Sequence, residues 1–214
     1  MSVSRQDVDW MKKIMLRVAY DGTAYHGWQI LNNGDTIEGE INKSIKQLTG
    51  EDCELVGGSR TDSGVHARDS VCVFDTISSI PAEKFSYALN QRLPEDIRIM
   101  SSREVASDFH PRHCDSVKTY EYHIYNAEFP DPMKRLYSYF TDNRLDVDAM
   151  KEAARFFVGE HDFSAFCAAG TLLEVGRGTI KPDDITRIIE SGDRSKAGPT
   201  APACGLTLME YRFT

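Results

Sequence analysis

Apolar residues in the first half of the chain recur at spacings that change between those of strands and those of helices. Residues 14–20 (IMLRVAY) alternate as they do in a strand. Apolar positions between 36 and 49 recur at helical spacing, which predicts an amphipathic helix with Thr36 as its N-cap and Gly50 at its end. The remaining predicted elements are strands at 53–57, 70–76 and 96–105 and a helix at 81–90. This order, β-α-β-β-α-β, is the split βαβ pattern of ferredoxin-like domains.

The second half of the chain begins in the same way but lacks the middle of the pattern. Its predicted elements are a strand at 117–125, helices at 146–158 and 182–191, and a last strand at 205–213. Residues 159–181, between the two helices, are too few for two strands and include a helical stretch, TLLEVG. We therefore expect the second half to lack its middle strands.

Together these patterns predict an α/β (α+β) fold in which two ferredoxin-like halves form a shared antiparallel sheet flanked by helices. The predicted divisions are a polar N-terminal extension at 1–12, an N-terminal half at 13–108 and a C-terminal half at 109–214.

The net charge of -8, taken alone, argues against a nucleic-acid partner, because surfaces that bind phosphates are usually basic. The charges are unevenly distributed, however. Residues 35–54 hold six acidic and two basic side chains, whereas residues 98–118 are slightly basic. Composition therefore permits a local RNA-binding groove without predicting one.

Cysteine usage and hydropathy indicate a reduced, cytoplasmic protein. The five cysteines are scattered and form no Cys-x-x-Cys pair, which argues against disulfides and against a zinc site. His110, His113 and Cys114 lie close in sequence, but no second pair of ligands accompanies them. No apolar run approaches the roughly 20 residues that span a membrane, and no secretory leader is present, so we expect no membrane association.

The segment richest in chemistry is GGSRTDSGVHA, from Gly57 to Ala67. Glycines on both sides of Arg60 and Asp62 allow a sharp turn and close approach to a ligand. In an extended chain these two side chains project to the same side, and an arginine beside a carboxylate keeps it ionised, as a nucleophile requires. A turn that carries a surface ion pair is the alternative interpretation.

RTDSGVHA also resembles the central motif of the tRNA pseudouridine synthase A (TruA) family, in which the aspartate of the motif is the nucleophile. That position is Asp62 here. Further segments resemble the family in the same order along the chain: VAYDGTAYHGWQ (18–29), ALNQRLPEDIRI (88–99), FHPRHCDSVKTYEYHIYN (109–126), GEHDFSAF (159–166) and DRSKAGPTAPACGLTL (193–208).

The resemblance implies an isomerase that converts uridine to pseudouridine in the anticodon stem-loop of tRNA (positions 38–40 of the tRNA). It implies a homodimer that grips the tRNA with both subunits, and it implies no redox cofactor and no metal. The aspartate attacks either the base or the sugar, and the sequence leaves this choice open. The target base has to be swung out of its stack to be reached.

Four further side chains are candidates for substrate contact. Tyr120 matches the first tyrosine of the family's Tyr-x-Tyr strand and is expected against the uracil ring, although alternating tyrosines also suit ordinary strand packing. His66 either supports the fold or touches RNA phosphate. Arg112 and Lys118 are candidates for phosphate contact or are solvated charges.

The chain departs from the family after Gly170. Family members continue there through two strands into a Phe-Leu-x-x-Met-Val-Arg helix, whose arginine packs against the nucleophile, whereas here Gly170 joins Thr171 directly. We therefore expect an inactive or nearly inactive chain that is prone to aggregate. A catalytically inactive RNA-binding relative and a truncated, non-functional fragment are the alternatives to an active isomerase.

Overall fold

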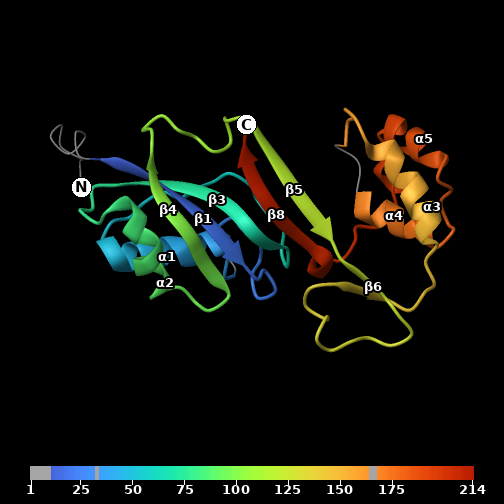
Figure 1. The fold of residues 1–214 in the computed structure, drawn as a ribbon, viewed down its shortest axis with the longest axis horizontal. Helices are drawn as coiled ribbons and strands as arrows, with labels where there is room; N and C mark the ends of the chain where they lie inside the picture. Colours follow the sequence, from blue (N-terminus) through green and yellow to red (C-terminus); the bar gives the residue numbers. More distant parts are fainter. Residues whose placement is uncertain (1–10, 32–33, 164–167) are drawn as a thin grey trace. The chain divides into compact units, whose positions relative to one another are not determined.

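The computed structural model describes residues 11–31, 34–163 and 168–214, which divide into two compact units (Figure 1). Unit 1 consists of Met1–Glu121 with Leu206–Thr214, and unit 2 of Tyr122–Gly205. Most of the predicted N-terminal extension, together with Cys167 and the end of the GEHDFSAF segment, lies outside the described residues. Within those residues, no helix has the length and apolar character needed to cross a membrane.

Unit 1 is a sheet with two helices against it, which confirms the mixed α/β class. Its elements are β1 (Lys12–Tyr20), α1 (Ile37–Thr49), β2 (Val56–Gly57), β3 (His66–Thr76), α2 (Phe85–Asn90), β4 (Ile97–Val105), β5 (Ser116–Tyr122) and β8 (Leu206–Phe213). The first six follow the predicted order β-α-β-β-α-β. A 3-10 turn at Ala82–Lys84 replaces the first turn of the predicted helix at 81–90.

The strands of unit 1 lie in the order β4-β1-β3-β8-β5, with β2 pairing β3. β1 is antiparallel to β3 and β4, and β2 is antiparallel to β3. β8, however, pairs in parallel with β3, with His66 opposite Thr207. The prediction of a wholly antiparallel sheet was therefore wrong. A strand that follows a hairpin must run antiparallel, but β8 returns to β3 after the long excursion of the chain through unit 2.

Side chains around Tyr211 hold β8 to the earlier strands. The Tyr211 amide donates to Asp69 Oδ2 on β3 at 3.3 Å, and Arg17 on β1 donates to the Tyr211 carbonyl at 3.1 Å. Arg17 and Asp69 also form an ion pair. The last strand is thus fixed to the centre of the sheet by side chains as well as by its backbone.

The main core of unit 1 lies between the sheet and helices α1 and α2. Both helices contribute fully buried residues that pack against alternate residues of β1, as the period-2 and helical patterns require. These residues include Ile14, Leu16, Val18, Ile37, Ile41, Ile45, Phe85 and Leu89. The helices therefore cover one face of the sheet, as Figure 1 shows.

In its described residues, unit 2 combines a small parallel pair of strands with three α-helices. Its elements are β6 (Ile124–Asn126), β7 (Tyr139–Thr141), α3 (Val147–Ala154), α4 (Ala168–Gly176) and α5 (Asp184–Ser191). Between α3 and α5 the described residues hold α4 but no strand, in line with the predicted lack of middle strands. A small core of Ala153, Val175 and Ile185 joins the three helices.

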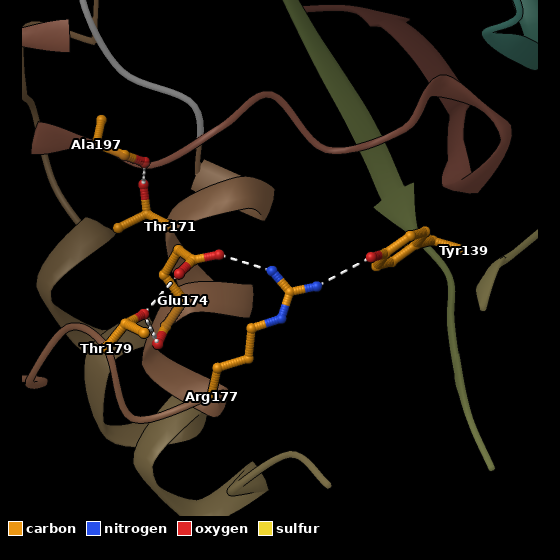
Figure 2. Close-up of polar contacts among 6 residues, drawn as sticks. All are labelled: Tyr139, Thr171, Glu174, Arg177, Thr179 and Ala197. Carbon is orange, nitrogen blue, oxygen red and sulfur yellow. Dashed lines mark hydrogen bonds and ion pairs between the residues drawn. The ribbon is translucent and has the colours of Figure 1, made fainter. Parts of the chain in front are cut away.

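Helix α4, which contains TLLEVG, is fixed within unit 2 by polar side chains (Figure 2). Glu174 accepts from Arg177 Nη1 at 2.6 Å and from Thr179 Oγ1 at 2.5 Å. Arg177 Nη2 also donates to the Tyr139 hydroxyl at 2.9 Å, and Thr171 Oγ1 donates to the Ala197 carbonyl. The Thr179 hydroxyl, followed by Arg177, lowers the pKa of Glu174. The stretch after the predicted gap is therefore a packed helix.

Candidate active site

Asp62 lies in the loop between β2 and β3, and the backbone on both sides of it is fixed. The Trp28 amide donates to the Thr61 carbonyl at 3.0 Å, and the hydroxyls of Tyr20 and Thr61 are 2.8 Å apart. The Val65 amide donates to the Asp62 carbonyl at 3.1 Å. The Asp62 side chain itself is exposed. The Asp62 carboxylate is thus presented to solvent from a loop whose backbone is held by hydrogen bonds.

The segment around Gly27 packs against the loop that carries Asp62. Sequence analysis did not assign this role to it. Gly27 has φ +92°, and a Cβ there would lie 2.6 Å from the Thr61 carbonyl oxygen, so only glycine fits. The neighbouring Tyr25 carbonyl accepts from the Ser63 hydroxyl at 3.2 Å and from the Gly64 amide at 3.3 Å. The second glycine of VAYDGTAYHGWQ was the available signal. Its partner, Thr61, lies more than 30 positions along the chain, and no local pattern identifies it.

His66 lies at the start of β3 and is buried. Its Nδ1 is 3.1 Å from the Gly22 amide nitrogen and also 3.1 Å from Asp21 Oδ1. As an acceptor, Nδ1 takes a hydrogen bond from the amide, and as a donor it gives one to the carboxylate. Either contact joins β3 to the turn after β1. Of the two roles expected for His66, this favours support of the fold.

Tyr120, on β5, lies beside the same loop. Its hydroxyl is 3.1 Å from Ser59 Oγ, and 43% of the residue is exposed. Ser59 is three positions before Asp62, so the loop and the tyrosine expected against the base are in direct contact within unit 1. The exposed part of the ring is available for stacking.

Arg60 and Asp62 form no ion pair with each other, and neither has an ion-pair partner among the residues that the structure describes. The backbone at 60–62 belongs to no strand, so the two-residue repeat that would place both side chains on one side does not apply. Arg60 instead lines a surface cavity together with Arg112 and Lys118. In the described part of the chain, no group of three or more His, Cys, Asp or Glu side chains is placed to hold a metal ion.

Comparison with known proteins identifies the family. The family model described as tRNA pseudouridine synthase matches residues 17–113 and 167–214. The chain is also 42% identical to tRNA pseudouridine synthase A of Acetivibrio thermocellus over 244 residues, covering 95% of this chain and all of that relative. This chain belongs to the tRNA pseudouridine synthase family. Two more family members show the same coverage: tRNA pseudouridine synthase A 2 of Clostridium perfringens, at 42% identity, and tRNA pseudouridine synthase A of Caldicellulosiruptor bescii, at 41%.

This member of the tRNA pseudouridine synthase family is shorter than those relatives. Each alignment runs over 244 residues and includes the whole relative, whereas this chain has 214 residues, so at least 30 residues of each relative (244 less 214) face none here. The two stretches that match the family model are separated by residues 114–166. The position of the missing segment, after Gly170, stays a prediction.

Proposed function

We propose that this chain isomerises uridine to pseudouridine in the anticodon stem-loop of tRNA, with Asp62 as the nucleophile. Family membership over 95% of the chain supports the reaction. The observation that supports Asp62 is its exposed side chain on a loop whose backbone is fixed at Thr61 and Val65. A preorganised nucleophile costs little reorganisation when the substrate arrives.

The reaction requires one bond to break and another to form at the same sugar carbon. Attack by the Asp62 carboxylate, on the base or on the sugar, allows the N1–C1′ bond of uridine to break. The base then rotates and C5 bonds to C1′. The bond to Asp62 breaks and returns the free carboxylate, the hydrogen on C5 leaves as a proton, and N1 gains one. Extruding the base costs a few kcal/mol. Stacking on the exposed face of Tyr120 offsets part of this cost.

The supporting roles follow from position. His66 holds the start of β3 against the Asp21–Gly22 turn, which fixes one end of the catalytic loop. Arg60 supplies positive charge beside the nucleophile at the RNA surface. We also propose that the protein acts in the cytoplasm as a homodimer. Light scattering during size-exclusion chromatography should then give twice the mass of one chain, and a mass of one chain would contradict the dimer.

The test is release of tritium from tRNA labelled at C5 of uridine, measured with enzyme in excess so that slow turnover is detected. The unmodified chain should release tritium, and Asp62→Asn should release none, because an amide is no nucleophile. Asp108→Asn is the matched control, since Asp108 is also an exposed aspartate of unit 1. The melting temperatures of all three proteins should agree. Substantial release by Asp62→Asn would place the nucleophile elsewhere.

A second candidate function is RNA binding without catalysis. The shortfall of at least 30 residues against the aligned relatives favours it, because the segment expected to be missing carries the arginine that packs against the nucleophile in the family. Tight binding of tRNA with no tritium release from the unmodified chain would support this candidate and contradict the isomerase.

A further inference from the structure

A surface cavity of about 360 Å³ in unit 1 adjoins the catalytic loop. Three cationic side chains line it: Arg60, Arg112 and Lys118. No carboxylate is among the lining residues that the structure describes. Acidic residues outnumber basic ones by 33 to 25 in the whole chain, so a cavity with cations alone departs from the average surface. Its chemistry is that of an anion site.

The floor of the cavity is rigid. Tyr211 is 1% exposed, and its hydroxyl donates to the Pro111 carbonyl at 2.7 Å. Lys118 Nζ donates to the Gly58 carbonyl at 3.3 Å and lies 5.1 Å from the centre of the Tyr211 ring. Ser116 Oγ lies 3.4 Å from the Tyr211 hydroxyl. These contacts fix the backbone that carries Arg112 and Lys118.

The two guanidinium groups, by contrast, remain available to a ligand. Arg60 and Arg112 are both exposed, and neither side chain has a hydrogen bond or an ion pair to any other residue of the described ranges. A guanidinium group binds phosphate oxygens in a bidentate manner. Two such groups and an ammonium around one cavity suit a single phosphate more closely than they suit a base edge.

The cavity also lies at the right place for RNA that enters the candidate active site. Arg60 is two positions before Asp62, and Lys118 is two positions before Tyr120 on β5. The Ser59 hydroxyl, on the cavity lining, is 3.1 Å from the Tyr120 hydroxyl. A group bound in the cavity is therefore a neighbour of the base that reacts.

We propose that this cavity binds a backbone phosphate of the RNA strand beside the target uridine. The proposal rests on the proposed function. The phosphate fixes the position of the strand while the uracil ring is extruded towards Tyr120 and Asp62. Phosphate contacts of this kind set register without reading sequence, so selection of the uridine depends on other contacts.

The test measures binding of a labelled anticodon stem-loop RNA over a series of KCl concentrations. Neutralising one phosphate releases about one counterion, so Arg112→Gln should lower the slope of log K against log salt by roughly 0.7 to 0.9. Arg112→Lys keeps the charge and should keep the slope. Arg92→Gln removes an exposed arginine that follows α2 and is the matched control for net charge. Lys118→Met, which keeps an apolar stem beside Tyr211, should repeat the loss of slope.

Equal slopes for Arg112→Gln and Arg92→Gln would overturn the proposal, as would an unmodified chain that shows no salt-dependent binding. Melting temperatures establish that each variant is folded. The readout needs no turnover, so it is separate from the test of the reaction. Loss of slope without tritium release supports the phosphate site and contradicts the isomerase. Tritium release by the unmodified chain, together with an unchanged slope for Arg112→Gln, would support the isomerase and contradict the phosphate site.

Discussion

Two aromatic side chains explain why Gly57 and Gly58 precede the loop that carries Asp62. A Cβ at Gly57 would lie 2.4 Å from Trp28 Nε1, and a Cβ at Gly58 would lie 3.0 Å from the ring of Tyr211. Each of these aromatic residues is only 1% exposed. The backbone before Asp62 is thus laid between two large side chains, and the absence of a Cβ permits this close approach.

We predict that Gly57→Ala destabilises the protein by about 1–3 kcal/mol, since a methyl group would be forced against the indole ring. Unfolding in urea measures the loss. Trp28→Phe removes the atoms that the new methyl group meets, so the double variant should lose less free energy of unfolding than the sum of the single changes. Strict additivity would show that this contact is not the cause.

At the scale of single residues, the sequence identifies the candidate nucleophile better than it identifies the residues that support its loop. Asp62 was identified because its motif is contiguous, and its role as nucleophile stays a prediction. Tyr211 was missed because its contacts with Gly58 and Pro111 depend on where β8 pairs, which no local pattern encodes.

Helix α1 was predicted closely because both of its ends carry local signals. Thr36 is the N-cap as predicted, with Oγ1 accepting from the Gly39 amide at 3.2 Å. Gly50 ends the helix with φ +77° and donates its N–H to the Lys46 carbonyl. The hydroxyl cap and the left-handed glycine each act within one turn, so sequence alone was enough to place them.

Thr36→Ala should lower the free energy of unfolding by about 1 kcal/mol, because a buried helix end loses its side-chain acceptor. Thr36→Ser keeps that acceptor and should retain most of the stability. Chemical denaturation of the three proteins provides the comparison. A loss in Thr36→Ser as large as that in Thr36→Ala would mean that the threonine methyl group, rather than the cap, is responsible.

Strands were predicted less well because their limits depend on distant partners. β3 begins at His66, four positions before the predicted start at 70, where it meets Thr207 of β8. The strand predicted at 117–125 is interrupted at His123, whose amide donates to the Gly205 carbonyl at 2.8 Å and whose carbonyl accepts from Tyr139 at 2.9 Å. These partners are far away in sequence.

Helix α4 should make unit 2 sensitive to acid. The pKa of Glu174 is held below its usual 4.5 in the folded chain, first by Thr179 and then by Arg177. A lowered folded pKa gives stability that is fully present above the unfolded value and is lost as the pH falls through the folded value. Glu174→Gln should therefore be less stable than the unmodified chain at pH 7, and the difference should shrink below about pH 4.5.

Circular dichroism during urea unfolding at pH 7 and pH 3.5 measures this effect. Glu128→Gln, at an exposed site of the same unit, is the control and should show no such pH-dependent difference. A gap between Glu174→Gln and the unmodified chain that stays the same at both pH values would contradict the assignment.

Over the whole molecule, the principal departure from the family is the missing length. We predict that inserting the corresponding segment of the Acetivibrio thermocellus relative after Gly170 raises soluble yield and tritium release together. Restoring an oriented charge beside a nucleophile is commonly worth roughly 10²-fold or more in rate. The comparison uses single-turnover rates of the chain with and without the insert. An unmodified chain that already reacts at the rate of the relative would show that the shortfall is tolerated.

β8 belongs to unit 1 although it follows unit 2 in the chain. Unit 1 therefore cannot complete its folding until unit 2 has been synthesised. A ribosome that has synthesised β1 to β5 has produced Asp62 but not Tyr211, whose ring lies against Gly58. All of unit 2 emerges before that ring does. During this interval β3 has no β8 paired with it at His66. The unpaired edge of β3 is then accessible to chaperones and proteases. Assembly of the candidate active site is therefore a late event in the life of each new chain.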